Sequence, residues 1–251
     1  MNHIFSQPLF VPIHLHRLFC ISSIFDTLVV LYKELMCGAY SQFTDEKKLA
    51  KRFGVTVPAL PKRYNIRPSQ PVAVIFNDNP GELSFALWGI YPPYDKPQKM
   101  FLINARSDSL GKPMWKKLLV EHRCLILADG FYEWYKPEDG GPKVPFRFEL
   151  KTREPFAFAG LWQEVEGKDG KPERHCVIIT TEPNELVGKI HNRMPAILDP
   201  EDEAKWLNPD LETTQLLELL KPYNFIAMES FSVSTKVNSP AYDSRDLIRQ
   251  I

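Results

Sequence analysis

The chain lacks an excess of charge of either sign, since its 251 residues carry 31 lysines and arginines against 31 aspartates and glutamates. A neutral chain is not drawn to nucleic acid by its overall charge, so any contact with DNA has to come from a local group of basic residues. No apolar run is long enough to cross a membrane, because the stretch at 18–32 is short and Asp26 interrupts it. Repeats and low-complexity tracts are also missing, which argues against an array of repeats.

Cysteines are few and scattered. The four of them are Cys20, Cys37, Cys124 and Cys176, with no Cys-x-x-Cys pair and no zinc-ligand spacing. This spacing favours a reducing, cytoplasmic compartment over a disulfide framework, and the sequence predicts neither a metal site nor a cofactor. Cys124 and Cys176 fall inside apolar segments, where thiols are commonly buried and inert.

The 22 prolines are spread along the chain, which favours many short strands over long helices. Strands are predicted at 72–76, 83–88, 124–127, 144–150, 156–162, 176–181 and 225–233, with turns at 79–81 and 167–170 and a loop at 64–68. Helices are predicted at 44–53, 114–122, 200–207 and 211–220. Many strands with a few peripheral helices indicate one α+β domain, built on a curled, largely antiparallel, barrel-like sheet.

The strand at 144–150 has a clear alternation. Its apolar residues alternate with Pro145, Arg147 and Glu149. This period predicts a half-buried strand, with one face in the core and the polar face in water.

The N-terminal 35 residues do not share the pattern of the rest, and they end just before Met36-Cys37-Gly38. If translation starts at Met36, or if the preceding peptide is cut, Cys37 becomes the first residue. It then carries a thiol and a free α-amine, a pair that condenses with an aldehyde to a Schiff base and closes to a thiazolidine. We expect 1–35 to be a mis-assigned start or a removed pro-segment, with a structural arm or weak membrane anchor as the alternative, and 36–251 to be the domain.

Three polar segments follow or close apolar ones: Asn104-Ala105-Arg106, the segment 130–134 and the segment 191–195. Glu133 stands between two aromatic residues, where partial desolvation would raise its pKa and suit it to acid–base work. The alternatives stay open at this point, because Glu133 could be a surface residue of an edge strand and His191 a structural histidine. Arg106 and Arg193 could equally be surface arginines, and spacing alone does not link the three segments.

A resemblance links them. Met-Cys-Gly, Tyr-Asn-x-x-Pro, Trp-Gly, Asn-Ala-Arg, Gly-Phe-Tyr-Glu-Trp and His-x-Arg-Met-Pro occur in this order between residues 36 and 195. Together they resemble the SOS-response-associated peptidase (SRAP) family, over nearly all of 36–251. The resemblance implies the SRAP fold and a DNA-repair protein of the SOS response. Such a protein recognises abasic sites in single-stranded DNA and crosslinks to them through an N-terminal cysteine, which shields the lesion.

The resemblance also implies catalytic roles. Cys37 supplies the thiol and the α-amine, and Asn104 holds the ring-opened sugar or the amine. Glu133 is the acid–base group of Schiff-base formation. His191 moves a proton during ring opening of the sugar and helps to reverse the crosslink.

The resemblance further implies a DNA-binding set. Arg106 and Arg193 match positions that hold backbone phosphates, where the guanidinium fork fits the oxygens. Thr180 supports the site by hydrogen bonding. Trp88 and Pro68 present flat apolar surfaces to the bases, a contact that tolerates any sequence.

Two positions depart from the family pattern. Ala39 stands where arginine is usual, which predicts weaker DNA binding with a shallower salt dependence, and predicts that Ala39→Arg steepens that dependence. Asp108 stands where a glutamate is common.

Three functions are therefore compared. The first is a crosslinker with lyase- and hydrolase-like chemistry, which acts as a monomer on abasic single-stranded DNA, away from membranes and in the cytoplasm at the nucleoid. The second is a cysteine peptidase that acts on itself or on other proteins, and self-cleavage before Cys37 would join these two. The third is a non-catalytic module that binds single-stranded DNA.

Overall fold

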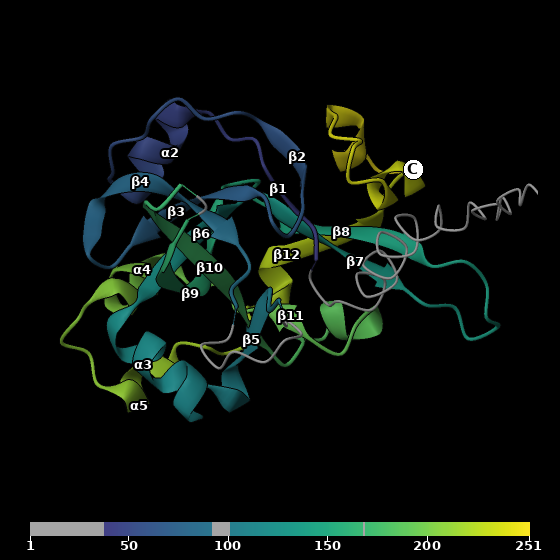
Figure 1. Ribbon diagram of the computed structural model, residues 1–251. Helices are drawn as coiled ribbons and strands as arrows, with labels where there is room; N and C mark the ends of the chain where they lie inside the picture. Colours follow the sequence, from purple (N-terminus) through teal and green to yellow (C-terminus); the bar gives the residue numbers. More distant parts are fainter. Residues whose placement is uncertain (1–37, 92–100, 168) are drawn as a thin grey trace, which may run out of the picture. The chain divides into compact units, whose positions relative to one another are not determined.

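Five strands form a barrel in the part of the chain that the structure describes (Figure 1). The computed structural model describes residues 38–91, 101–167 and 169–251. The barrel strands are β3 (Pro71–Phe76), β4 (Asn79–Trp88), β6 (Arg123–Ala128), β9 (Phe156–Glu166) and β10 (Pro172–Thr181). They pair in the order β10-β4-β3-β6-β9, and β9 pairs again with β10, which closes the ring. Only the β10–β4 pairing in this ring is parallel, so the predicted curled, largely antiparallel α+β fold is confirmed.

A second, antiparallel sheet has the strand order β12-β8-β7-β1-β2. Its strands are β1 (Tyr40–Gln42), β2 (Arg63–Ile66), β7 (Gly130–Tyr135), β8 (Val144–Leu150) and β12 (Met228–Ser232). Two short strands, β5 (Asn104–Arg106) and β11 (Met194–Pro195), pair with β10 beyond its contact with β4. The described chain therefore enters the fold through the second sheet, next to β7.

Strands β3, β6 and β10 are largely buried on both faces, and alternate residues of these strands belong to two different apolar clusters. In β6, Cys124 and Ile126 belong to a cluster shared with the second sheet, whereas Leu125 and Leu127 belong to a cluster shared with the helices. This explains why β3, β6 and β10 have nearly continuous apolar sequences, since a strand covered on both faces has no solvent side.

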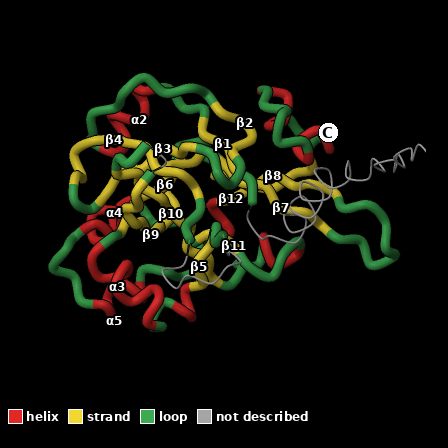
Figure 2. Tube along the Cα trace, in the orientation of Figure 1, coloured by secondary structure: helices red, strands yellow, loops and turns green. Residues whose placement is uncertain are grey.

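The helices are short and lie outside the barrel (Figure 2). They are α2 (Glu46–Phe53), α3 (Pro113–Glu121), α4 (Pro200–Leu207) and α5 (Thr213–Glu218), with single 3₁₀ turns at 107–109, 187–189, 225–227, 235–238 and 245–248. Asp45 caps the start of α2 by accepting from the Lys48 amide, and Gly54 ends it with a φ of 69°, a left-handed conformation that suits glycine. None of the helices among the described residues is long and apolar enough to span a membrane.

One loop prediction and one turn prediction are wrong. The segment Tyr64–Ile66, predicted as a loop, is part of strand β2. Asn79-Pro80-Gly81, predicted as a turn, begins β4, and the turn itself lies at Asn77 and Asp78. In both cases the turn-forming residue types sit at the end of a strand, where they are tolerated.

The polar face of β8 is buried, which corrects the prediction of a half-buried strand. Arg147 is 0% exposed, and its guanidinium pairs with Glu149 at 2.7 Å from Nε to Oε2. It also donates to the Ser41 hydroxyl at 2.9 Å and to the Asp129 carbonyl at 3.1 Å. The polar face is therefore covered within the second sheet, where the Arg147 side chain reaches across β7 to β1, rather than exposed to solvent.

Arg123 joins two helices to the barrel. Its buried guanidinium donates to the carbonyl groups of Leu119 and Val120 at the end of α3, and to those of Trp206 and Asn208 at the end of α4. Helix ends leave such carbonyls without intrahelical partners, so one side chain satisfies both ends.

We expect Arg123→Met to lower the free energy of unfolding by about 3 kcal/mol, because the volume is kept while several carbonyls lose their donors. Urea denaturation would measure the loss. Arg153→Met, at a side chain that is 79% exposed, is the matched control and should change stability little. Equal effects of the two substitutions would contradict this role of Arg123.

Candidate active site

The end of β10 brings several predicted site residues onto neighbouring strands. β5 runs parallel to it, with Asn104 opposite Ile178 and Arg106 opposite Thr180. β11 lies on the other side, with Pro195 opposite Thr180 (Figure 1). Three segments that are far apart in the sequence therefore meet at one place through backbone pairing.

Arg193, just before β11, is fixed from two sides. Its Nη2 donates to the backbone carbonyl of Thr180 and, at 3.3 Å, to the Thr180 hydroxyl. Its Nη1 lies 3.8 Å from Oδ2 of Asp108. The whole residue is 5% exposed, so this cation is held in one position rather than displayed on a mobile side chain.

Arg106 is exposed and shares the same carboxylate. Its Nε lies 3.1 Å from Oδ1 of Asp108 and its Nη2 lies 2.6 Å from Oδ2, a two-pronged contact. The hydrogen bond from Arg106 lowers the pKa of Asp108 to about 2, so this carboxyl is ionised at neutral pH. Two guanidinium groups thus meet at one carboxylate.

His191 is a half-buried base. Its Nδ1 lies 3.2 Å from the Arg193 amide nitrogen and 3.3 Å from the Arg193 carbonyl oxygen, so the ring is held against the backbone of its own loop. Burial lowers its pKa below the usual value, and the positive charge of Lys143, which precedes β8, lowers it further. The ring is therefore neutral at pH 7 and can accept a proton.

Glu133 lies on β7 and is 2% exposed, so its alternative interpretation as a surface residue is wrong. Its strand neighbours are Phe146 of β8 and, on the chain itself, the buried Tyr132. Desolvation of this carboxyl, expected from its aromatic neighbours, is confirmed.

One apolar cluster underlies all these groups. Phe146, which is opposite Glu133, packs on the same cluster as Ile103, which precedes the site asparagine. Ile190, which precedes the site histidine, and Met194, which follows the site arginine, belong to it as well. Residues adjacent to the predicted polar groups, in the sequence or across a strand pair, therefore share one apolar cluster.

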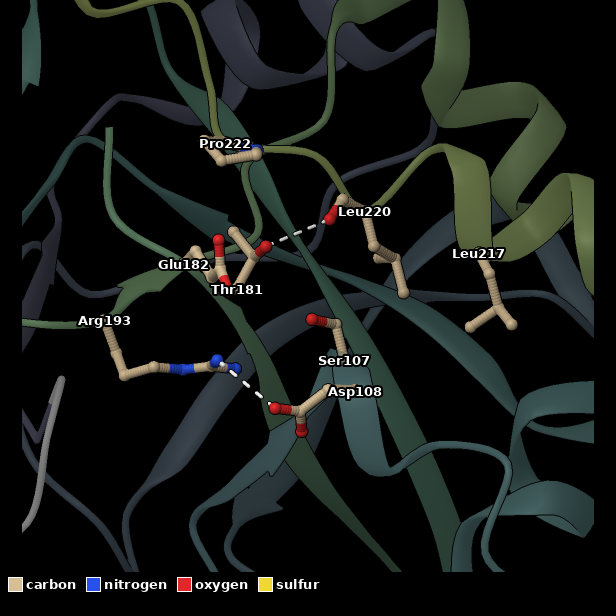
Figure 3. A pocket seen from close by; sticks show the side chains of 8 residues that line it. All are labelled: Ser107, Asp108, Thr181, Glu182, Arg193, Leu217, Leu220 and Pro222. Atoms are coloured by element: carbon tan, nitrogen blue, oxygen red, sulfur yellow. Dashed lines mark hydrogen bonds and ion pairs between the residues drawn. The ribbon is translucent and has the colours of Figure 1, made fainter. Parts of the chain in front are cut away.

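A cleft of about 290 Å³ opens beside Arg193 and Asp108 (Figure 3). Thr181 and Glu182 from the end of β10 line it, together with Ser107, Leu217, Leu220 and Pro222. The two arginines with their carboxylate thus stand at the edge of an open surface that a ligand can reach.

Comparison with known proteins agrees with this geometry. The family model described as SOS response associated peptidase (SRAP) matches residues 36–240. The chain belongs to the SRAP family.

Among relatives of the SRAP family, "Abasic site processing protein YoqW" of Bacillus subtilis is 42% identical over 85% of this chain and 99% of its own length. "Abasic site processing protein HMCES" of Gallus gallus is 36% identical, over 64% of this chain and 55% of its own. A crystal structure of a protein from Bacteroides thetaiotaomicron has a TM-score of 0.75 at 25% identity, covering 86% of this chain and 100% of that one.

The first described residues of this SRAP chain are buried under its C-terminal segment. Ala39 is 1% exposed and packs in a cluster with Tyr132, Val233, Val237 and Leu247. The Ala39 carbonyl accepts from the Tyr132 amide at 3.0 Å, which continues the pairing of β1 with β7. Cys37 lies outside the described residues. The expectation of a phosphate contact from an arginine at position 39 stays a prediction, and the packing of Ala39 against an apolar cluster lends it no support.

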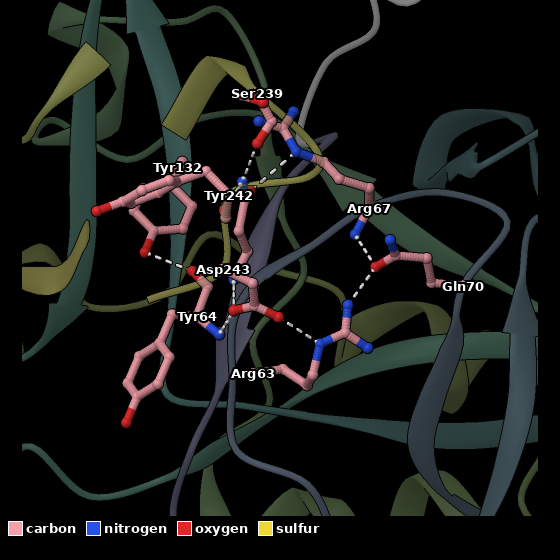
Figure 4. Close-up of polar contacts among 9 residues, drawn as sticks. Arg63, Tyr64, Arg67, Gln70, Tyr132, Ser239, Tyr242 and Asp243 are labelled. Atoms are coloured by element: carbon pink, nitrogen blue, oxygen red, sulfur yellow. Dashed lines mark hydrogen bonds and ion pairs between the residues drawn. The ribbon is translucent and has the colours of Figure 1, made fainter. Parts of the chain in front are cut away.

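Asn65, from the Tyr-Asn-x-x-Pro motif, holds that C-terminal segment, a role that the sequence did not reveal. Its buried amide donates to the carbonyl groups of Val237, Ser239 and Tyr242 at 2.9–3.2 Å. Asp243 completes the attachment by accepting from the backbone amides of residues 64 and 65 and by pairing with the Arg63 side chain (Figure 4).

Trp88 and Pro68 do not present apolar surfaces to bases. Both are buried, and the Trp88 indole donates to the Ile103 carbonyl at 2.9 Å within the core. Trp88 instead stacks edge-on against Tyr40 of β1, at 5.3 Å between ring centroids. The indole hydrogen bond ties Trp88 to Ile103, the residue before Asn104.

We expect Ala39→Arg to lower the free energy of unfolding by about 3 kcal/mol, because it buries an unpaired charge in an apolar cluster. Asn192→Arg adds the same charge at an exposed position of the site loop and is the control, expected to leave stability unchanged. Thermal and urea unfolding would compare them. A stable Ala39→Arg protein with a steeper salt dependence of DNA binding would support the expectation of a phosphate contact.

We expect Lys143→Gln to raise the pKa of His191 toward its usual value, since one of the two causes that lower it is removed. NMR titration of the imidazole would measure the change. Lys136→Gln, also exposed on the loop between β7 and β8, should leave the titration as it is. If neither substitution changes the pKa of His191, the loop between β7 and β8 does not approach the histidine.

Proposed function

We propose that this SRAP protein recognises abasic sites in single-stranded DNA and forms a thiazolidine crosslink through Cys37 once that residue is N-terminal. The printed names of the relatives, abasic site processing proteins, support action on abasic DNA. The residues of this chain support the finer chemistry, and the proposed partner is single-stranded DNA bound by a monomer at the nucleoid.

The observation that carries the proposal is the register of β1 against β7. Tyr40 pairs with Phe131, and the Ala39 carbonyl accepts from the Tyr132 amide. The same register places Gly38, which is buried, across from Glu133. This register supports the proposal, because it brings the residue bonded to Cys37 to the strand that carries a buried carboxyl.

The proposed reaction is balanced without a cofactor. The abasic sugar opens from its ring to its aldehyde, and the free α-amine of Cys37 adds to the aldehyde carbon. Water leaves to give a Schiff base, and the Sγ of Cys37 then adds to the same carbon and closes the thiazolidine. Only one water is lost, because ring closure adds the thiol across the C=N bond.

Each neighbouring group has a matching task. Glu133, kept from solvent, protonates the leaving hydroxyl as water departs, and His191, neutral at pH 7, takes or returns the proton as the sugar ring opens. Asn104 holds the open sugar from β5. Arg106 and Arg193 bind the phosphates on either side of the lesion, and Thr180 holds Arg193 in place.

Exposure of Cys37 is a precondition, because an internal cysteine has an amide where the reaction needs an amine. We propose that cleavage before Cys37, by this site acting on its own chain, or a start at Met36 followed by methionine removal, provides it. Peptidase action on other proteins gains no support from the geometry.

We expect a chain that begins at Cys37 to give a denaturation-stable adduct with an abasic single strand, whose mass is the sum of both minus one water. A chain that retains Met36, verified by its intact mass before the reaction, is the matched control, because it keeps the Cys37 thiol while an amide replaces the Cys37 amine. Denaturing gels and intact mass spectrometry would follow both.

Cys37→Ala should abolish the adduct, and Glu133→Gln should slow it about a hundredfold with the same product mass. Equal adduct from the Met36 chain would refute the thiazolidine, since a thiol alone cannot close that ring. Non-covalent binding without any adduct would leave only a DNA-binding module.

A further inference from the structure

Asp108 lies between Arg106 and Arg193, and Asp108 and Arg193 line the open cleft (Figure 3). Its carboxylate takes both prongs of Arg106, at 3.1 and 2.6 Å, and Oδ2 also lies 3.8 Å from Nη1 of Arg193. A phosphate with two non-bridging oxygens makes the same kind of contact with a guanidinium fork. The carboxylate therefore has the charge and the shape of the group that these arginines are suited to bind.

The two arginines differ in freedom. Arg193 is anchored to Thr180 and buried, whereas the Arg106 side chain is 57% exposed and the Asp108 side chain 50% exposed. Asp108 sits on a single 3₁₀ turn, Ser107–Ser109, that directly follows β5. The exposed Asp108 carboxylate thus lies between the anchored Arg193 and the exposed Arg106.

We propose that Asp108 is an internal substitute for a DNA phosphate, which a strand must displace from Arg106 and Arg193 when it binds. This inference rests on the proposed function, since it takes single-stranded DNA as the ligand. An exposed ion pair contributes little free energy, so a phosphate can replace the carboxylate, but each binding event has to break it. Asp108 would thus lower the affinity for any strand, intact or damaged, while it keeps both cations oriented.

The first test is non-covalent binding of an intact, labelled single strand by Asp108→Asn, measured by fluorescence anisotropy at several salt concentrations. An intact strand has no aldehyde, so the readout does not depend on crosslinking. We expect on the order of fivefold tighter binding at low salt. We expect the slope of log affinity against log salt to change little, because the bound strand contacts the same two arginines in both proteins.

The chain offers a matched control in Asp78→Asn. Asp78 forms the same two-pronged pair with Arg174, at 3.0 and 2.7 Å, near the opposite end of β10. This substitution removes the same charge and the same kind of ion pair away from the cleft, so it should leave both affinity and slope nearly unchanged.

A second variant tests the route of the effect. In an Arg106→Ala background, Asp108→Asn should gain much less, because the carboxylate then competes for one arginine only. Weaker or unchanged binding by Asp108→Asn, or an equal gain from Asp78→Asn, would overturn the inference. Tighter binding by Asp108→Asn in a chain that forms no adduct would uphold the inference while refuting the proposed crosslinking.

Discussion

The strand β10 changes partners along its length, and the site depends on that change. Its first part, up to Ile178, pairs with β9, and at His175 and Cys176 its other edge pairs with β4 to close the barrel. Beyond that point the barrel partner gives way to β5, and at its end β10 pairs with β11. Buried backbone groups need hydrogen-bond partners, so the strand can extend beyond the barrel only because β5 and β11 supply them. Two residues of the candidate site, Asn104 and Arg106, lie on β5, and Arg193 directly precedes β11.

The second sheet has a different role, because it holds the start of the described chain beside β7. β1 is only three residues long and could not be stable by its own pairing. The C-terminal segment covers it: Val233, Val237 and Leu247 pack on Ala39, and Asn65 holds the carbonyls of that segment. The first described residues and the C-terminal segment therefore meet beside β7, and the motif residue Asn65 holds them together.

Much of the fold could be predicted from the sequence, because strands such as β6 are apolar on both faces and helices such as α2 carry clear caps. Arg147 could not be predicted as buried, since a single strand's alternation does not reveal whether its polar face meets water or another strand. The grouping of Asn104, Glu133 and His191 came from resemblance rather than spacing: Asn104 lies on β5 beside β10, His191 lies shortly before β11, and Glu133 lies on β7 of the other sheet. Resemblance also misplaced Trp88, since a motif gives the residue but not the direction in which its side chain points.

The chain carries equal numbers of basic and acidic residues, and several of its arginines are paired with carboxylates. Its guanidinium groups are matched internally: Arg147 with Glu149, Arg52 with Glu203, and Arg106 with Asp108. As proposed above for Asp108, such a site would bind phosphates by displacing the carboxylate rather than by bulk attraction, so intact DNA would be held weakly. In the proposed reaction that weakness is no disadvantage, because the adduct is kept by a covalent bond and the non-covalent contacts need only align the aldehyde with the amine. Selectivity for the lesion then lies in the chemistry of the aldehyde, which intact strands lack.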